Sequence, residues 1–430
     1  MAREAARRLA LLGALVALGL GLPAAASAAP LTIGAYYYTW YGPGEQGWDL
    51  GYLRGALDSP QLPLLGEYAS SDPGLIATHY DWAHRYGVGV FFCSWSGRNR
   101  SDDLTIRDNL LPSPARGATR LAIFYESILR LGKGQDDRIA IDDAAIATIT
   151  DDFDYLARTY FSDPGYYRIN GRPVVVLYVT RIFTGQVAQA IQAIRDRVRA
   201  ITGLNPYLIG DEVDADIGPQ PTHIRLFDAI TGYTLYSRKQ TPGWARETGF
   251  ITRVERRFRL FRTAARKARV AFVPSSLPGF NDRAVRLEAD HYVLPHELDP
   301  TNSDPTSLFA ASLRLAGSYV DPRLRLLAVT SWNEWNEDTQ IEPTASAETS
   351  SAPLALTLGY PQRSYGFGLL GRLARFKRNW ESASSRPSER KKRKAPQAHV
   401  GGWLLGSNVL LRFREETEKS AQLRASISAR

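Results

Sequence analysis

"LRLLAVTSWNEWNEDTQIE", residues 324–342, joins an apolar run to a polar segment that is rich in tryptophan and asparagine. The run LRLLAVT has the continuous apolar character of a parallel strand that is buried on both faces. Two glutamates, Glu334 and Glu337, follow this run three residues apart. The segment is either a polar loop with packed tryptophans or a sugar site, where carboxylates transfer protons and aromatic faces hold a ring. The kind of sheet that contains the run distinguishes these interpretations.

Seven more apolar runs alternate with stretches of helical periodicity along the chain. The expected strands cover 31–38, 87–95, 120–126, 172–179, 205–212, 227–234, 269–276 and 324–332. The expected helices include 75–87, 145–161, 185–203, 245–268, 306–320 and 368–380. Eight successive βα units predict an α/β fold, a (β/α)8 TIM barrel, with a single catalytic domain; a doubly wound open sheet is the alternative.

In a TIM barrel the active site forms at the carboxyl ends of the strands. Aromatic and acidic residues recur at these ends, namely Tyr36, Tyr37, Tyr38, Trp95, Glu126, Tyr178, Asp211, Glu212, Tyr233, Glu334 and Glu337. On a continued strand Glu334 and Glu337 would point to opposite faces. The backbone should therefore turn after Trp335, and strand eight should end around residues 332–334.

The segment WNEWNEDTQIE (332–342) resembles the W-N-E-W-H-E-G-T-Q-I-E motif of glycoside hydrolase family 99, the endo-α-1,2-mannosidases and mannanases. Further similar segments occur in the family's order along the chain. They are YYYTWYG (36–42), LGEYASSDPGLIATH (65–79), YYRINGRPVVVLY (166–178), FDAITGY (227–233) and PGFNDRAVR (278–286). The resemblance covers roughly 32–345 and implies a retaining, endo-acting hydrolase on a (β/α)8 barrel, with an oligosaccharide or polysaccharide as substrate.

The resemblance also implies a role for each glutamate. Glu334 would act as a base on the 2-hydroxyl of the substrate, whose oxygen attacks the anomeric carbon to give a 1,2-anhydro sugar. Glu337 would protonate the leaving oxygen and then activate the water that opens the epoxide. This scheme differs from the usual retaining mechanism, in which a carboxylate is itself the nucleophile.

Other site residues follow from the same resemblance. The implied substrate-binding residues are Tyr36, Tyr38, Trp95, Glu126, Tyr178, Tyr233, Asp282, Arg286, Trp332, Asn333 and Trp335. Packing inside the barrel is the alternative for the aromatic residues. A structural ion pair is the alternative for Glu126, and a salt bridge within a loop for Asp282 and Arg286.

Four positions depart from the family pattern. Asn336 replaces a histidine and Asp338 a glycine, which places an extra carboxylate beside the two glutamates. Val179-Thr180 stands where the family often has Asp-Ser. These changes leave three interpretations open: a hydrolase of α-mannan, a hydrolase of another α-linked surface polysaccharide, and a carbohydrate-binding protein without activity.

The two ends of the chain differ from its middle. Residues 1–28 have a basic start, an apolar run of 14 residues and an Ala-Ser-Ala ending, which predicts a cleaved signal peptide and a secreted or cell-envelope location. The run is short for a membrane anchor, which is the alternative. Residues 383–430 are basic and predicted to be disordered, leaving 29–382 as the hydrolase domain. Because the middle carries almost no net charge, nucleic acid is not an expected partner.

The sequence excludes several other features. Cys93 is the only cysteine, so no intramolecular disulfide can form. GPGEQG (42–47) matches a dinucleotide fingerprint but lacks the helix and the acidic residue that the fingerprint requires, so we expect a loop over the barrel mouth. No histidines or cysteines have metal-ligand spacing, so we expect no cofactor and no catalytic metal. The oligomeric state is left open.

Overall fold

The fold was analysed in a computed structural model of the chain. The structure describes residues 29–42, 48, 61–134, 136–236, 249–282, 293–298, 301–345 and 364–385. The predicted signal peptide, Arg286, most of the GPGEQG loop and residues 386–430 lie outside the described residues. Helix α10 (Gly368–Ser385) crosses the expected domain end at residue 382.

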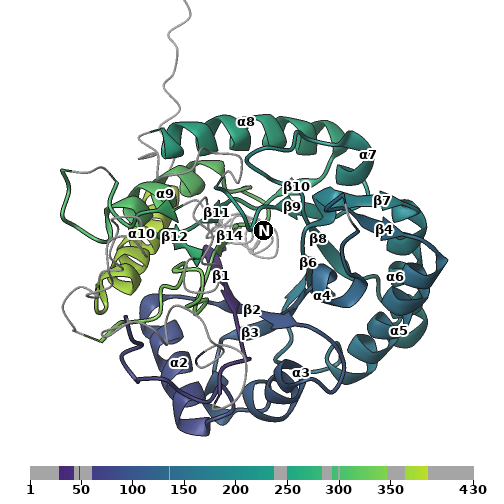
Figure 1. Ribbon diagram of the computed structural model, residues 1–430, viewed down its shortest axis with the longest axis horizontal. Coiled ribbons are helices and arrows are strands. Elements are labelled where there is room, and N and C mark those ends of the chain that lie inside the picture. The colour runs from purple at the N-terminus through teal and green to yellow at the C-terminus, as the bar shows by residue number, and fades with distance from the viewer. Residues whose placement is uncertain are drawn as a thin grey trace, which may run out of the picture. The chain divides into compact units, whose positions relative to one another are not determined.

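Parallel strands form a closed ring (Figure 1). In chain order the barrel strands are β1 (Thr32–Tyr37), β2 (Val90–Trp95), β3 (Arg120–Tyr125), β6 (Arg172–Leu177), β8 (Tyr207–Asp211), β9 (Ala229–Thr231), β10 (Ala271–Phe272) with β11 (Ser275–Ser276), and β14 (Leu326–Val329). The two short pieces of the seventh strand close the ring, because β10 pairs with β9 and β11 pairs with β14. The eighth strand in turn pairs with the first.

Helices follow the strands and surround the ring (Figure 1). They are α2 (Pro73–Tyr86), α3 (Ser101–Thr105), α4 (Ser127–Leu131), α5 (Asp143–Thr159), α6 (Val187–Thr202), α7 (Pro221–Ile224), α8 (Phe250–Ala268), α9 (Ser307–Tyr319) and α10. Short strands outside the ring are β4 (Ile139–Ile141), β5 (Arg168–Ile169), β7 (Phe183–Gly185), β12 (Phe280–Asn281) and β13 (Val293–Leu294). The predicted (β/α)8 barrel is confirmed, and all eight strands fall within the expected runs.

Local sequence explains how α2 is placed against the barrel. Asp72 caps its start, accepting hydrogen bonds from the backbone N–H groups of Gly74 and Leu75 at 2.6 and 3.0 Å. Pro73 at the first position has no N–H to leave unpaired. The helix ends at Gly87, whose φ of 86° suits a residue without a β-carbon. These signals fix the register of α2 and direct His79 toward the barrel.

Strand eight is shorter than expected. It ends at Val329, not at residues 332–334. Beyond Val329 the N–H groups of Thr330 and Trp332 still donate to the carbonyls of Ser276 and Tyr36 on the neighbouring strands, at 2.9 and 2.7 Å. The same stretch also pairs with a returning segment of its own loop: the Ser331 N–H donates to the Thr339 carbonyl at 2.7 Å, and the Glu342 N–H donates to the Trp332 carbonyl at 2.9 Å. Both glutamates therefore lie on a folded loop instead of on a strand. Their side chains are then free of the alternation that would place them on opposite faces of a strand.

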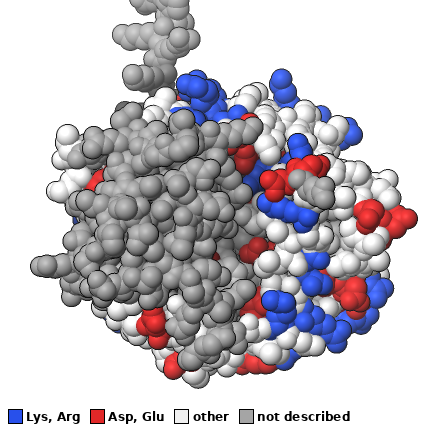
Figure 2. Space-filling model, in the orientation of Figure 1, with Lys and Arg blue, Asp and Glu red and all other residues white. Residues whose placement is uncertain are grey.

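Charges of both signs are distributed over the surface drawn in Figure 2, where lysine and arginine lie interspersed with aspartate and glutamate. This distribution agrees with a middle region that carries almost no net charge. Within the described ranges, no helix is both long and apolar enough to span a bilayer.

Candidate active site

Tyr38 marks the centre of the candidate site, one residue beyond the end of β1. Its side chain is buried, and burial raises the pKa of its hydroxyl well above the usual value. The negative charges of Glu126, Glu334 and Glu337 raise this pKa further. Three carboxyl groups, which follow strands three and eight, thus act electrostatically on one tyrosine hydroxyl.

A chain of hydroxyl groups leads from Tyr38 to Glu337. The Tyr38 hydroxyl donates to that of Tyr233 at 2.7 Å, and the Tyr233 hydroxyl donates to Oε2 of Glu337 at 3.4 Å. Tyr233 follows β9, so this chain crosses the barrel mouth from the first strand to the sixth. Glu337 is only partly buried, so its carboxyl group can be reached from the barrel mouth.

Glu334 is held by its own loop. Its side chain is 3% exposed. Its backbone N–H donates to Oγ of Ser331 at 2.8 Å, and its Oε1 accepts from the backbone N–H of Asn336 at 3.1 Å. The carboxylate is therefore fixed by its own loop, with one oxygen on a backbone donor. Such a group is suited to act as a base in a fixed position.

Glu126 ends β3 as a buried carboxyl group. Burial raises its pKa to about 8, against the effect of the Ser94 hydroxyl, which donates to its Oε1 at 2.7 Å; the charge of Glu337 adds to the increase. No lysine or arginine among the described residues forms an ion pair with it. This geometry favours the sugar-binding role over the structural ion pair, because a protonated carboxyl can donate to a sugar oxygen.

The raised pKa of Glu126 predicts how stability depends on pH. Between the unfolded pKa near 4.5 and the folded pKa of about 8, the folded state binds more protons than the unfolded state. Stability contributed by this group is therefore complete below pH 4.5 and is lost as the pH rises toward 8. We expect Glu126→Gln to raise the melting temperature relative to the wild type more at pH 8 than at pH 5. Equal shifts at both pH values would show that Glu126 is already ionised in the folded protein.

Four aromatic rings pack below these carboxyl groups inside the barrel. The ring of Tyr36 lies edge-on to Phe124 and Tyr233, with centroids 4.7 and 5.0 Å away, and Tyr178 contacts Phe124 and Tyr233 at 5.1 and 5.4 Å. Tyr36 is completely buried, which fits the packing alternative. Tyr178 is half-buried and Tyr233 reaches Glu337, so these two form the part of the wall that can meet a sugar.

Trp95 lies behind the site. Its indole is completely buried, stacks on Tyr125, and donates to Oδ1 of Asp103 at 2.7 Å. The guanidinium of Arg130 covers its ring with a separation of 5.6 Å. These contacts favour packing over a sugar subsite.

The tryptophans of the 332–342 loop also face inward. Trp332 and Trp335 are at most 1% exposed. Asn333 between them is bound to the backbone of β1: its Oδ1 accepts from the Tyr38 N–H at 2.7 Å, and its Nδ2 donates to the Tyr38 carbonyl at 2.8 Å. All three residues therefore support the loop, and none of them presents an open face to a sugar.

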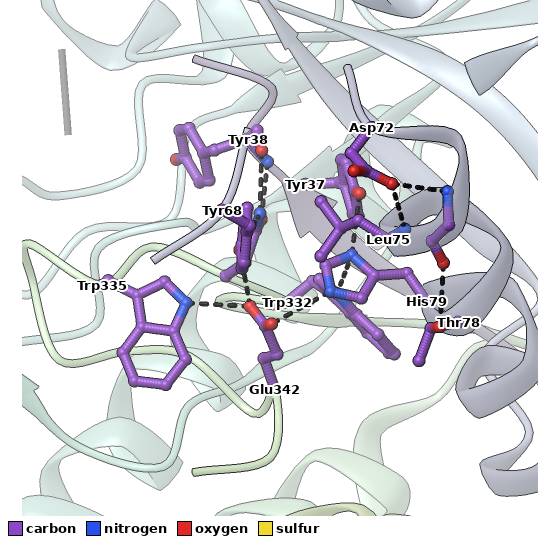
Figure 3. A network of polar contacts seen from close by, with 12 residues as sticks. Tyr37, Tyr38, Tyr68, Asp72, Leu75, Thr78, His79, Trp332, Trp335 and Glu342 are labelled. Carbon is purple, nitrogen blue, oxygen red and sulfur yellow. Dashed lines mark hydrogen bonds and ion pairs between the residues drawn. The ribbon is translucent and has the colours of Figure 1, made fainter. Parts of the chain in front are cut away.

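Residues that the sequence did not single out hold these tryptophans in place (Figure 3). They are His79, Tyr68 and Glu342. The resemblance to the family could have drawn attention to them, because Tyr68 and His79 lie in the similar segment 65–79 and Glu342 lies in 332–342. Their roles depend on contacts between segments far apart in the chain, which spacing does not show.

Asp338 does not provide a free carboxylate to the site. It has a φ of +52°, the conformation that the family's glycine adopts without strain. Nε2 of His296 lies 3.3 Å from its carboxylate and 3.1 Å from its carbonyl oxygen. Burial lowers the pKa of His296, but Asp338 outweighs this effect and the pKa lies above the ordinary value. The expected extra charge is therefore paired with an imidazole, which also supports the turn directly after Glu337.

Val179 shows how the loop after β6 is fixed. This β-branched residue has a φ of +47°, a strained conformation that needs support from its surroundings. Its N–H donates to Oδ2 of Asp211 at 3.1 Å, and Oδ1 of the same carboxylate accepts from the Tyr233 N–H at 2.9 Å. Arg181 pairs with Asp211 at 2.5 Å. Asp211 therefore connects the loops that carry Tyr178 and Tyr233 and is not itself available to substrate.

The last two predicted site residues follow the seventh strand. Asp282 is 2% exposed, and the neighbouring Asn281 N–H donates to the Glu337 carbonyl at 2.8 Å. This bond connects the segment after strand seven to the loop that carries the glutamates. Arg286 lies outside the described residues, so its role stays a prediction.

In the described part of the chain, no three histidine, cysteine, aspartate or glutamate side chains are grouped to hold a metal ion. We expect glycan hydrolysis by the purified protein to be unchanged by a chelator such as EDTA, because proton transfer by carboxyl groups needs no metal. Activity that a chelator abolished and a divalent ion restored would contradict this expectation.

Comparisons with known proteins agree with this geometry. The family model for Glycosyl hydrolase family 99 matches residues 52–364. The glycoprotein endo-alpha-1,2-mannosidase-like protein of Mus musculus is 25% identical over 356 residues, which cover 76% of this chain and 72% of the relative. The glycoprotein endo-alpha-1,2-mannosidase of Mus musculus is 24% identical over 365 residues, covering 74% of this chain and 69% of that protein.

Solved structures show the same fold. The GH99 endo-alpha-mannosidase from Bacteroides thetaiotaomicron superimposes with a TM-score of 0.57 at 19% identity, covering 82% of this chain and 98% of that one. A glycoside hydrolase-like protein superimposes with a TM-score of 0.60 at 18% identity, covering 84% and 97% of the two chains.

Proposed function

Because this chain belongs to glycosyl hydrolase family 99, we propose that it is an endo-acting hydrolase of α-linked mannosides and that it retains the anomeric configuration. One observation carries the proposal: Glu334 and Glu337 lie on the loop after strand eight, where Glu334 is fixed by the Asn336 N–H and Glu337 accepts from the Tyr233 hydroxyl. One relative is named an endo-alpha-1,2-mannosidase and another an endo-alpha-1,2-mannosidase-like protein, which supports an α-1,2-mannan-type substrate.

Glu334 acts first, as the base. Its carboxylate removes the proton of the substrate's 2-hydroxyl, and that oxygen attacks the anomeric carbon. Its backbone bonds to Ser331 and Asn336 support this role, because a base is effective only when it is held within reach of the proton that it removes.

Glu337 acts as the acid in the same step. It donates its proton to the glycosidic oxygen as that bond breaks, which leaves a 1,2-anhydro sugar. The Glu337 carboxylate then takes a proton from water, whose oxygen opens the epoxide at the anomeric carbon, while Glu334 returns the first proton to the 2-oxygen. Two inversions give net retention. The partial exposure of Glu337 fits a group that must exchange leaving group for water.

A digestion screen tests the proposed activity. Purified protein would be incubated with α-1,2-linked mannan, with other α-linked surface polysaccharides and with β-linked glucan, and the products analysed by mass spectrometry. We expect cleavage of α-1,2 linkages at which the attacked mannose keeps a free 2-hydroxyl, as where the preceding sugar is attached at another carbon. Internal residues of a linear α-1,2-mannan carry the next sugar on this oxygen and should resist cleavage. If only another α-linked polymer were cleaved, the proposed substrate would be wrong but the proposed reaction class would stand.

The double variant Glu334→Gln/Glu337→Gln separates a hydrolase from a binding protein. A hydrolase loses all product formation in this variant while it continues to bind the glycan. If the wild type bound mannan without cleaving it, and the double variant bound it equally well, the carbohydrate-binding alternative would hold.

We also propose that the protein acts outside the cytoplasm. The predicted signal peptide supports this location, because its basic start, short apolar run and Ala-Ser-Ala ending are typical of exported proteins. Amino-terminal sequencing of exported protein should find a chain that begins at Ala29.

A further inference from the structure

Three distant segments meet at Glu342, which is completely buried (Figure 3). Its Oε2 accepts from the Tyr68 hydroxyl at 2.7 Å and from Nε1 of Trp335 at 2.8 Å. Its Oε1 lies 3.0 Å from Nε2 of His79, which α2 supplies. A buried carboxylate is costly unless its oxygens are hydrogen-bonded, and these three donors meet that requirement.

The indole of Trp332 selects which ring nitrogen of His79 carries the proton. The indole N–H can only donate, and it lies 3.3 Å from Nδ1 of His79, so Nδ1 must accept. The Tyr37 hydroxyl, 2.9 Å from the same nitrogen, then also donates to it, and the two donors share its single lone pair. The ring proton therefore lies on Nε2 and points to Glu342. In this tautomer the His79 N–H is one of the three hydrogen-bond donors to Glu342.

The two indoles flank the catalytic loop. Trp335 is held by Glu342 directly, and Trp332 is held by Glu342 through His79. Asn333 and Glu334 lie between these anchored residues. Asn333 adds a third anchor, since its Nδ2 donates to the Tyr68 hydroxyl at 3.2 Å. The position of the Glu334 backbone is thus set on both sides by groups that depend on one carboxylate.

We propose that Glu342 and His79 form a buried positioning pair for Glu334, holding the indoles of Trp332 and Trp335 on either side of the base. This inference rests on the proposed function, because the pair matters for turnover only if Glu334 takes the proton of the substrate's 2-hydroxyl. Neither residue touches substrate. Their effect is on the geometry of the proton transfer, where a displacement of about 1 Å can cost roughly 10²-fold in rate.

Glu342→Gln tests the pair with little change of volume. The amide nitrogen of glutamine cannot accept a hydrogen bond, so it must place its own N–H groups against at least one of the three donors. His79 cannot relieve this by moving its proton to Nδ1, because that proton would then face the N–H of Trp332. We expect kcat on an α-1,2-mannoside to fall about 10²-fold with KM nearly unchanged. Tyr68→Phe removes one donor and keeps the carboxylate, so it should fold normally and lower kcat by a smaller factor.

Asp228→Asn provides a matched control at the amino-terminal end of the barrel. The carboxylate of Asp228 likewise accepts three hydrogen bonds, from Arg172, Arg195 and the Leu208 N–H. The Asp228→Asn substitution should lower the melting temperature without changing kcat. If Glu342→Gln lowered the melting temperature as Asp228→Asn does and kept wild-type kcat, the pair would be structural only.

Indole N–H resonances measured by ¹⁵N NMR separate this inference from the proposed function. Those of Trp332 and Trp335, assigned from the corresponding Trp→Phe variants, should be protected from hydrogen exchange in the wild type and lose protection in Glu342→Gln. A wild type that cleaves no mannoside would refute the proposed function, while the NMR result would still test the network. Unchanged protection in Glu342→Gln would refute the positioning pair.

Discussion

Glu337→Gln should reduce hydrolysis of natural mannosides by roughly 10²–10⁴-fold, the usual contribution of general acid catalysis. A poor leaving group needs the proton that Glu337 donates, and glutamine cannot supply it. A glycosyl fluoride leaves with little protonation, so cleavage of the C–F bond should be largely retained in this variant. The measurement is kcat/KM for an α-1,2-linked oligosaccharide and for the matching fluoride.

Glu334→Gln provides the contrast. A base on the 2-hydroxyl is needed whatever group leaves, so this variant should lose both substrates. Glu67→Gln, a change at an exposed glutamate in the loop before α2, is the control and should retain wild-type rates. If both site variants kept full activity, the glutamates would be structural and the reacting groups would lie elsewhere.

Arg181→Met should lower the free energy of unfolding by about 3–5 kcal/mol, the cost of removing one partner from a buried ion pair. Arg181 contacts Asp211 at 2.5 Å and Asp214 at 2.8 Å, and little of any of the three side chains is exposed. Burial already raises the pKa of Asp211 against the effect of the arginine. Without the cation, a fully buried carboxylate has only backbone donors. Urea unfolding at pH 7 gives the value.

Two further variants show whether the uncompensated charge causes this loss. Arg259→Met breaks an exposed pair with Glu255 on α8, and its effect should stay within about 0.5 kcal/mol. Adding Asp211→Asn to Arg181→Met should recover part of the lost stability, since it removes the unpaired charge. A double variant no more stable than Arg181→Met would assign the cost to lost packing instead.

The barrel could be predicted because it depends on local signals. Continuous apolar runs between amphipathic segments marked all eight strands, and helical periodicity over 75–87 marked α2. The convergence of Glu126, Glu334 and Glu337 followed from the rule that strand ends meet at one face of a barrel. These predictions need only the order of elements along the chain.

The parts that sequence could not show depend on contacts across the chain. The spacing of Glu334 and Glu337 predicted a turn, but strand eight ends earlier than expected, at Val329, and Ser331 pairs with the returning segment of its own loop. Tryptophan beside glutamate is typical of a sugar site, yet both indoles point inward to His79 and Glu342. An acidic residue at position 338 looked like an added charge until its partner, His296, was known.

Turnover of a paired set of substrates tests the central claim most directly. One is an α-1,2-linked mannoside. The other is the same compound without the 2-hydroxyl on the sugar whose anomeric carbon is attacked. The account predicts hydrolysis of the first with an α-configured product in the initial ¹H NMR spectrum, and no turnover of the second. Normal cleavage of the 2-deoxy compound would contradict the account, since Glu334 would then act without the neighbouring hydroxyl.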